Sequence, residues 1–386
     1  MNRWWDDKRF GDIDSPTYVY NQAIIREQAF LVRKEMNDIT LLYALKANSH
    51  PIILDQMKNE ELIDGVDVAS LGELRKALRA GFPPGSISVT GPSKPLRFLK
   101  ECLSVQVGTI CVESIVEMER ICTLGGMQSG NLLLRVNPKE EVRAFQLKIS
   151  GRSTPFGVDE EDLGEALDYL KSRRHVLPFK GIHVHAGSQC FSARGFSLHT
   201  QAVLDLANDV KNYGLPVSII NLGGGMGYGN WLPHRKADIV AFGNQLRYIR
   251  GQHGFEGEVR IEPGRFLVAP SGVYATPICT IKESRGTTFV ILEGGVNHLF
   301  ALSHIGYQTK QIWVEKQSFG EGESKKVQLV GPLCTPVDSF GGLVELKNPR
   351  VGDVLLFPCN GSYGLSMSPT GFLSHPLPQE RFVDYE

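Results

Sequence analysis

The chain lacks the features that mark nucleic-acid-binding and membrane proteins. Its 41 basic and 42 acidic residues leave a formal net charge of -1, and no run of basic residues is interleaved with aromatic ones. Such a balance gives no electrostatic attraction for nucleic acid or for an anionic membrane. No stretch approaches the roughly 18 apolar residues of a membrane span, and no basic segment followed by an apolar one stands at the start. We therefore expect no nucleic-acid partner and no membrane partner.

Cysteine is also used sparingly. The seven cysteines are odd in number and are scattered without CxxC spacing, which argues against a secreted disulfide framework and against a structural zinc site. We therefore expect a cytoplasmic protein that holds no metal. Internal repeats and low-complexity tracts are absent, and 386 residues, 42% of them hydrophobic, suffice for two domains or one large one.

What the sequence does contain is a repeated alternation of short apolar runs with longer stretches of helical period. "TLLYAL" is followed by "SHPIILDQMKNE", for example, and "GVDVAS" by "LGELRKALRAG". There are eight such runs, and "EVRIEPGR" is the last of them. Each is nearly continuously apolar, as a strand buried on both faces should be. Eight units in roughly 240 residues are what a TIM barrel requires. We predict an α/β fold with a (β/α)8 barrel over residues 22–262.

The pattern changes after the eighth run. "SGVYATPICTIKES", "TTFVILEGG" and "VGDVLLFPCNGSYG" are rich in β-forming residues, with Gly and Pro punctuation and little helical period. We therefore predict a C-terminal antiparallel β-domain, a sandwich or a barrel, over residues 263–386. The opening segment "PTYVYNQ" also has the pattern of a strand, so residues 1–21 are expected to pair with that domain.

Polar residues stand where the apolar runs stop. In a TIM barrel the active site lies at the carboxyl ends of the strands. Taken singly, Lys46 would more often be a solvated strand end, His185 a core histidine bonded to a carbonyl, and Glu262 the salt-bridge partner of Arg265. Their convergence favours a functional site. The polar strand ends are Lys46, Asp67, Arg135, His185, the glycines 223–225, and Glu262 with Arg265.

Two glycine-containing turns indicate where an anion would bind. "NLGGGMGYG" follows the seventh strand, where bare backbone N–H groups can turn toward a phosphate, although three glycines can equally form only a tight turn. Gly264 of "EPGR" follows the eighth strand, and TIM-barrel phosphate sites often use these two loops. A phosphate site with Lys46 suggests pyridoxal phosphate held as a Schiff base. Glu262 could then keep the ring nitrogen protonated, and His185 could lie against the ring.

These residues resemble a known family. "YALKAN", "HVHAGSQ", "NLGGG" and "EPGR" are similar to motifs of the fold-type III pyridoxal phosphate decarboxylases, which include diaminopimelate, ornithine and arginine decarboxylases and, more distantly, alanine racemase. "GPLCTPVDSF" and "NGSYG" correspond to the family's GPxC and GAYG segments in the second domain. The resemblance implies an alanine racemase-like fold and a homodimer in which the GPxC segment reaches the active site of the neighbouring subunit.

The resemblance also implies roles for individual residues. Lys46 would form the Schiff base, His185 would stack on the ring, and Glu262 would pair with the ring nitrogen, where alanine racemase instead has an arginine. Cys334, otherwise a buried structural thiol, would donate a proton to the substrate carbon after carbon dioxide leaves. Asp67 and Arg135 would line the floor behind Lys46. The phosphate would be held by Ser188, Gly223, Gly224, Gly225, Gly264, Arg265 and Tyr363.

The residues expected to contact the substrate depart from the better-known relatives. Diaminopimelate and ornithine decarboxylases usually have Glu or Asp after the cysteine, whereas this chain has Thr335, and a neutral hydroxyl compensates a distal ammonium poorly. His375 stands near the place of an arginine-bearing segment of the diaminopimelate enzymes, and Asp338 lies beside the cysteine turn. "GRSTPFGVD" would shape the pocket, and Arg152 could contact an acidic tail, although a solvated arginine is the commoner case.

We therefore predict a pyridoxal phosphate-dependent decarboxylase of a conjugated or carrier-bound amino acid. It would be similar to antibiotic-pathway members that act on a glutamyl group carried by an acyl carrier protein, and to siderophore-pathway members that act on citrate-conjugated amino acids. Two alternatives remain open. One is a diaminopimelate, ornithine or lysine decarboxylase of primary metabolism. The other is a non-catalytic regulator, which would be expected to have lost cofactor-site residues that this chain retains.

Overall fold

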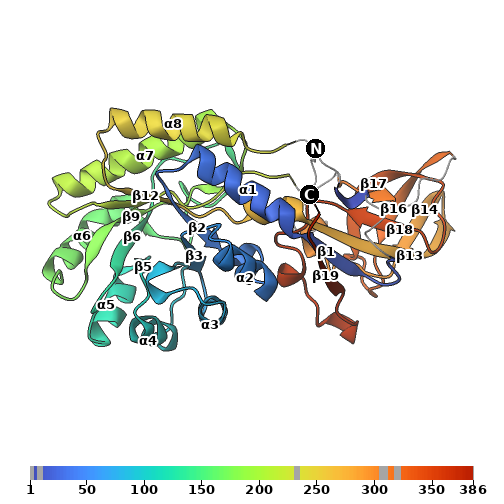
Figure 1. The fold of residues 1–386 in the computed structure, drawn as a ribbon, viewed down its shortest axis with the longest axis horizontal. Coiled ribbons are helices and arrows are strands. Elements are labelled where there is room, and N and C mark those ends of the chain that lie inside the picture. Colours follow the sequence, from blue (N-terminus) through green and yellow to red (C-terminus); the bar gives the residue numbers. More distant parts are fainter. Residues whose placement is uncertain (1–3, 7–11, 230–234, 304–311, 317–322, 386) are drawn as a thin grey trace. The chain divides into compact units, whose positions relative to one another are not determined.

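The computed structural model describes residues 4–6, 12–229, 235–303, 312–316 and 323–385. The chain divides into two compact units, each visible in Figure 1. The barrel unit comprises Ala29–Gly227 and Ala237–Gly264, and the β-unit comprises Met1–Gln28, Tyr228–Lys236 and Arg265–Glu386. No helix within the described residues is long and apolar enough to span a bilayer.

Eight parallel strands close into a ring in the barrel unit. Their order is β5-β4-β3-β2-β12-β11-β9-β6, and β5 pairs with β6 to complete the barrel. The predicted TIM barrel is therefore confirmed. The strands are β2 (Thr40–Ala44), β3 (Gly65–Val68), β4 (Ile87–Val89), β5 (Thr109–Val112), β6 (Asn131–Asn137), β9 (Phe179–His183), β11 (Ile219–Asn221) and β12 (Glu258–Ile261).

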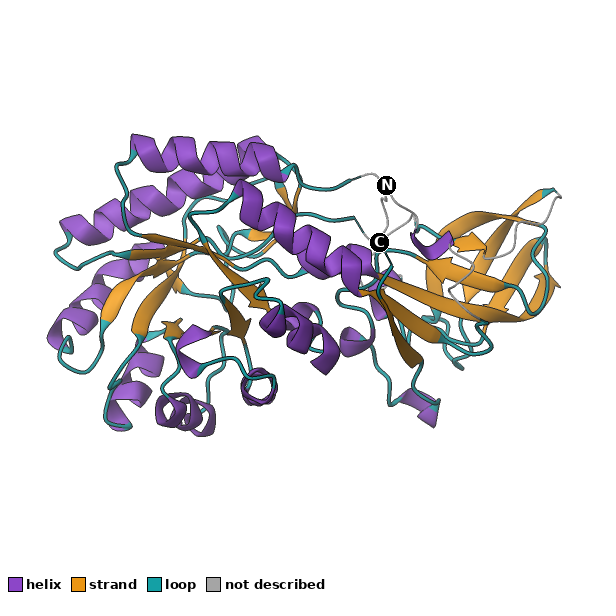
Figure 2. Ribbon diagram, in the orientation of Figure 1, coloured by secondary structure: helices purple, strands orange, loops and turns teal. Residues whose placement is uncertain are grey.

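Helices surround the strand ring, as Figure 2 shows. Local sequence fixes several of their starts: Ser70 accepts a hydrogen bond from Glu73 N (3.1 Å), and Ser114 accepts one from Glu117 N (3.2 Å). Both are Ser-x-x-Glu capping sequences. The α-helices in the described part of the chain are α1 (Gln22–Glu35), α2 (Pro51–Asn59), α3 (Leu71–Arg79), α4 (Leu96–Val105), α5 (Ile115–Thr123), α6 (Leu163–Ser172), α7 (Ala193–Asn212), α8 (Ile239–Gln252) and the short α9 (Arg265–Val268).

Three further strands form beyond the carboxyl ends of the barrel strands. β7 (Phe145–Lys148) pairs antiparallel with β10 (Gly187–Cys190), and β8 (Val158–Asp159) pairs parallel with β6. These strands lie in the connections that follow β6 and β9. They therefore give regular structure to the segments that border the predicted site.

The β-unit is built on one sheet whose pairings are antiparallel except for β1–β19 and β14–β16. The order is β15-β18-β13-β14-β16-β17, and β1 pairs with both β13 and β19. The predicted second, β-rich domain is therefore present, and the N-terminal strand belongs to its sheet. The strands are β1 (Thr17–Asn21), β13 (Gly272–Ser284), β14 (Thr287–Leu292), β15 (Glu315–Lys316), β16 (Ser324–Val330), β17 (Ser339–Lys347), β18 (Val354–Phe357) and β19 (Gln379–Val383).

Candidate active site

The barrel strands bring Lys46 to the end of β2, in a short 3-10 turn (Leu45–Ala47). Leu45 and Ala47 are buried, whereas the lysine itself is exposed. Its positive charge makes a lowering contribution to the pKa values of Asp67, His185 and Glu262, although burial raises the pKa of Asp67 overall. The four side chains, far apart in sequence, therefore share one electrostatic environment.

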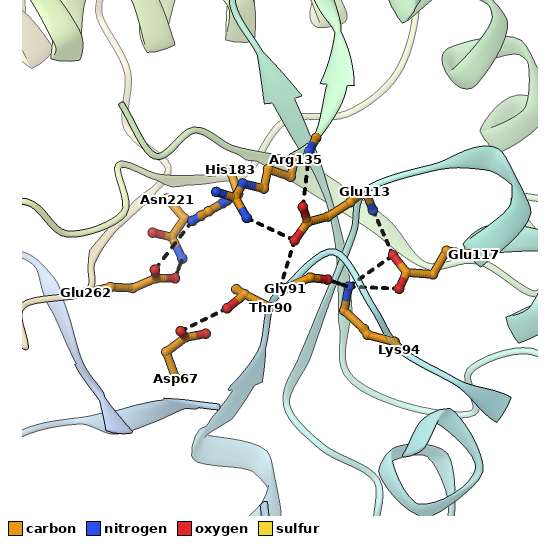
Figure 3. Close-up of polar contacts among 11 residues, drawn as sticks. Asp67, Thr90, Gly91, Lys94, Glu113, Glu117, Arg135, His183, Asn221 and Glu262 are labelled. Carbon is orange, nitrogen blue, oxygen red and sulfur yellow. Dashed lines mark hydrogen bonds and ion pairs between the residues drawn. The ribbon is translucent and has the colours of Figure 1, made fainter. Parts of the chain in front are cut away.

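Glu262 follows β12 directly and is only 5% exposed. Asn221 Nδ2 donates a hydrogen bond to its Oε1 (2.7 Å), and His183 Nε2 lies 3.4 Å from its Oε2 (Figure 3). Burial alone would raise the pKa of this carboxyl. The ion pair and hydrogen bond with His183, together with the charges of Lys46 and His185, instead lower the pKa to about 2. Glu262 is therefore a buried but ionised carboxylate.

Asp67 lies near the carboxyl end of β3 and is 2% exposed. Thr90 Oγ1 donates to its Oδ2 (2.9 Å), while its Oδ1 has no hydrogen-bond partner among the described residues. Burial, followed by the negative charge of Glu262, raises the pKa of Asp67 well above its usual value, and Lys46 and Thr90 offset this only in part. The site thus holds one carboxylate that favours its charged form and one that favours its protonated form.

His185 lies against the glycine loop that follows β11. Gly224 N donates to His185 Nδ1 (3.0 Å), so the ring is in the tautomer with its proton on Nε2. Burial, followed by the charges of Lys46 and Arg135, lowers the pKa of His185 well below its usual value. A Cβ on Gly223 would lie 2.5 Å from His185 Nδ1, and the backbone there has φ +65°. Glycine is required at this position because histidine and loop touch.

Gly225 and Gly264, also predicted to contact the phosphate, lie at close approaches between backbone segments of the barrel unit. A Cβ on Gly225 would lie 2.4 Å from Gly187 O, which places the strand carrying Ser188 beside the glycine loop. A Cβ on Gly264 would lie 2.8 Å from the Cβ of Ala47, the residue after Lys46. The glycines therefore allow backbone segments to approach closely around Lys46 and His185.

Arg135 belongs to a second group of buried charges. Its Nη1 donates to Glu113 Oε1 (3.0 Å), and Lys94 Nζ donates to both oxygens of Glu117 (2.9 and 3.0 Å). Figure 3 shows this group beside the Glu262 group. The predicted floor residue Arg135 is thus held by a carboxylate that the sequence analysis did not identify.

The predicted residues of the β-unit show three different environments. Arg265 lies with its guanidinium carbon 4.6 Å from the centre of the Tyr363 ring. Cys334 is exposed, and Thr335 beside it is half-buried. Asp338 is 3% exposed, and both of its carboxylate oxygens accept backbone hydrogen bonds, from Val296 N (2.8 Å) and Leu333 N (2.7 Å). Asp338 therefore holds the turn that presents Cys334.

Two other predicted substrate contacts are less buried. The guanidinium of Arg152 donates to the carbonyl of Lys148, and its side chain is exposed. His375 is half-buried. Burial raises the pKa of Asp338 and lowers that of His298, and the charge of His375 makes a smaller, lowering contribution to both. His375 therefore lies near the Cys334 turn, whereas Arg152 is bonded to the last residue of β7.

Several residues of the site were not predicted from the sequence. His183 and Asn221 lie two residues before His185 and Gly223, and a period of two in a strand places such residues on the same face. That spacing was the available signal. Glu113 stands directly after β5, at the kind of position that identified the other strand ends. His183 is only 1% exposed and Asn221 is fully buried.

These residues fit pyridoxal phosphate. The lysine is open to solvent, the ionised carboxylate lies near it at the barrel end, and the glycine loops offer backbone N–H groups without obstructing side chains. Among the described residues no cluster of His, Cys, Asp and Glu suits a metal ion. Fold and site together define the class of alanine racemase-like pyridoxal phosphate enzymes.

Comparison with known proteins gives the family. The model of the pyridoxal binding domain of pyridoxal-dependent decarboxylases matches residues 22–269. The chain is 33% identical to the L-glutamyl-[BtrI acyl-carrier protein] decarboxylase of Niallia circulans, covering 97% of this chain and 89% of that protein. It is 31% identical to the 2-[(L-alanin-3-ylcarbamoyl)methyl]-2-hydroxybutanedioate decarboxylase of Staphylococcus aureus, covering 88% and 86%.

A solved structure gives the same result. The diaminopimelate decarboxylase of Helicobacter pylori, complexed with L-lysine, superposes with a TM-score of 0.86 at 25% identity over 98% of this chain and 93% of that one. The chain belongs to the pyridoxal-dependent decarboxylase family. It is an amino-acid decarboxylase whose cofactor is pyridoxal phosphate, and the alternative of a non-catalytic regulator is set aside.

Proposed function

We propose that this decarboxylase removes the α-carboxylate of a conjugated or carrier-bound amino acid. The relatives named for such substrates, a carrier-bound glutamyl group and a substituted alanine conjugate, are 33% and 31% identical to the chain. In the same sequence comparison, six diaminopimelate decarboxylases share between 26% and 29% with the chain. The observation that carries the proposal is Thr335, a neutral residue next to the exposed thiol of Cys334.

The ionised carboxylate of Glu262 supports the catalytic part of the proposal. Bound pyridoxal phosphate supplies a ring that accepts the electron pair left when carbon dioxide departs. Glu262 would hold a proton on the ring nitrogen, and His183 and Asn221 would keep Glu262 charged and oriented. Lys46 would bind the cofactor's aldehyde carbon through Nζ and yield that position to the amine of the substrate.

Protonation of the substrate carbon needs a separate donor. We assign this role to Cys334, because its thiol is exposed and its turn is held by the buried carboxylate of Asp338. In this assignment the thiol gives its proton to the α-carbon after carbon dioxide has left. We further propose a homodimer in which Cys334 serves the site of the partner subunit.

The phosphate and substrate contacts complete the assignment. Backbone N–H groups of the glycine loop, with Ser188, Gly264, Arg265 and Tyr363, would hold the phosphate. Thr335 and His375 would face the far end of the substrate, and Thr335 offers a neutral hydroxyl there in place of a carboxylate. Such a site suits an acidic or bulky substituent better than a free basic amino acid.

Carbon dioxide release over a substrate panel tests the proposal. The panel contains free ornithine, lysine, arginine and diaminopimelate, citryl-amino acid conjugates, and a glutamyl-acyl carrier protein. We expect a conjugate or carrier-bound member to give the highest kcat/KM. Thr335→Glu, which restores a carboxylate, should raise the relative turnover of diaminopimelate. Rapid turnover of free diaminopimelate alone would overturn the proposal.

Two variants test the assigned roles. Lys46→Ala should lose the visible absorbance of the lysine-bound cofactor, whereas Cys334→Ala should keep that absorbance and lose turnover. A fully active Cys334→Ala enzyme would contradict the proton donor. If sites are shared, mixing the two inactive variants should restore about one quarter of the wild-type activity, because half of the dimers are mixed and each mixed dimer has one intact site.

The runner-up is a diaminopimelate decarboxylase. Its specific support is the close structural match to the Helicobacter pylori enzyme at a TM-score of 0.86. The residue after the cysteine separates the two candidates, because a neutral hydroxyl replaces the expected acidic side chain. The substrate panel decides between them directly.

A further inference from the structure

Glu113 accepts three hydrogen bonds although it is only 7% exposed. Its Oε1 accepts from Arg135 Nη1 (3.0 Å) and from Gly91 N (2.8 Å), and its Oε2 accepts from Gly157 N (3.1 Å). Figure 3 shows the carboxylate between Arg135 and Gly91. The donors come from the segment after β4, from β6, and from the end of the loop between β7 and β8. Glu113 therefore connects three separate parts of the site's rim.

The loop between β7 and β8, residues 149–157, is tied to Arg135 by a second contact. The guanidinium carbon of Arg135 lies 4.8 Å from the centre of the Phe156 ring, at cation–π distance. Gly157 has φ +79°, and a Cβ there would lie 3.1 Å from the Arg135 carbonyl oxygen. Arg135 is thus held between the carboxylate of Glu113 and the ring of Phe156.

The start of this loop is held independently. Asn137 Oδ1 accepts from Gly151 N (2.9 Å), and Asn137 Nδ2 donates to the carbonyl of Arg152 (3.0 Å). Asn137 Nδ2 also donates to Asp159 Oδ1 (2.6 Å), in the strand that follows the loop. Between these two anchors, Glu113 holds the part of the loop at Phe156 and Gly157. That part can loosen while the Asn137 contacts persist.

We infer that Glu113 is a positioning residue that fixes Arg135 and the end of the 149–157 loop together, and thereby sets the substrate side of the site. The inference rests on the proposed function, in which this loop borders the substrate. Arg135 acts on His185 through its charge, so the loop is connected to the cofactor side by the same side chain. A substrate that displaces the loop also acts on Arg135.

A matched control exists in the adjacent ion pair. Lys94 is fully buried and bonds to Glu117 and to the Gly91 carbonyl (2.7 Å), and Glu117 Oε2 accepts from Glu113 N (2.8 Å). None of these bonds reaches the 149–157 loop. The double variant Lys94→Met/Glu117→Gln removes both charges together and leaves an amide oxygen to accept from Glu113 N.

The experiment compares Glu113→Gln with this double variant, both loaded with pyridoxal phosphate. Amide hydrogen exchange of the peptide containing Gly157 and chymotryptic cleavage after Phe156 report on the loop, and kinetics are measured with the best substrate of the panel. We expect Glu113→Gln to make amide exchange at Gly157 and cleavage after Phe156 faster. It should also raise KM about tenfold, because a charge-assisted hydrogen bond is lost. Cofactor affinity and kcat should stay within about threefold in both variants.

Either of two results would overturn the inference. One is an unchanged KM and unchanged exchange at Gly157 in Glu113→Gln, and the other is an equal loosening of the loop in the double variant. If Glu113→Gln does not fold, Phe156→Leu, which removes the ring from Arg135 without touching the carboxylate, must show the rise in KM or the inference is wrong. Failure of the proposed function would instead appear in the wild-type enzyme, as no turnover of any conjugate.

Discussion

Two regions at the same end of the barrel each bury a carboxyl group, and they shift its pKa in opposite directions. Glu262, directly after β12, is 5% exposed and has its pKa lowered to about 2. Asp67, within β3, is 2% exposed and has its pKa raised. Burial is nearly equal, so it does not explain the difference. Glu262 has His183 and Asn221 as hydrogen-bond partners, whereas among the described residues Asp67 has only the hydroxyl of Thr90. Partners, rather than depth, determine which group stays charged.

The two groups also influence each other. The negative charge of Glu262 raises the pKa of Asp67, and Lys46 lowers the pKa values of both. Two like charges in one buried site disfavour joint ionisation. The pair of Asp67 and Glu262 therefore favours a single negative charge, and that charge is on Glu262, the residue expected to meet the cofactor's ring nitrogen.

The largest expected effect comes from removing that charge. Glu262→Gln keeps the shape of the side chain but cannot hold a proton on the ring nitrogen, so kcat should fall by about 10²- to 10⁴-fold, the usual range for a positioned acid or base. Stopped-flow carbon dioxide release measures the loss, and the visible spectrum checks that the cofactor is still bound. Activity within threefold of wild type would show that the charge of Glu262 is not needed for catalysis.

A smaller effect tests why Glu262 is charged. His183→Gln removes the main charge that lowers the pKa of Glu262. The pKa should therefore rise, and the acidic limb of the kcat/KM profile should move up by about one pH unit for each 1.4 kcal/mol of lost interaction. His253→Gln, which changes a histidine in contact with Gln201, serves as the control. Coinciding acidic limbs in all three proteins would show that His183 does not control the ionisation.

The sequence predicts this region in part, and the physical reason is the geometry of parallel strands. Apolar runs ending in polar residues identified Lys46, Asp67 and Glu262, because the carboxyl ends of barrel strands converge. The same logic locates the barrel strands themselves. These features follow from patterns within a few residues, which a sequence displays directly.

The partners of these residues could not be predicted in the same way. His183 lies inside an apolar strand, and its contact with Glu262 joins positions 79 residues apart. The bonds from Val296 N and Leu333 N to Asp338 are made by backbone groups, which carry no sequence signature. The contacts of Glu113 and Asp338 therefore depend on the tertiary structure, and a substrate contact by Asp338 stays a prediction.

The smallest effect distinguishes the two carboxyl groups by stability. Because the folded-state pKa of Asp67 is raised, its contribution to stability is present at low pH and is lost as pH rises through that pKa. The stability of Asp67→Asn relative to wild type should therefore increase with pH. Glu262 has the opposite sign, because its lowered pKa stabilises the fold above the unfolded value and that contribution is lost toward pH 2. The deficit of Glu262→Gln should shrink on acidification. Thermal melts of the cofactor-bound proteins between about pH 3 and pH 8 measure both slopes. Slopes of the same sign would mean that the two carboxyl groups ionise alike.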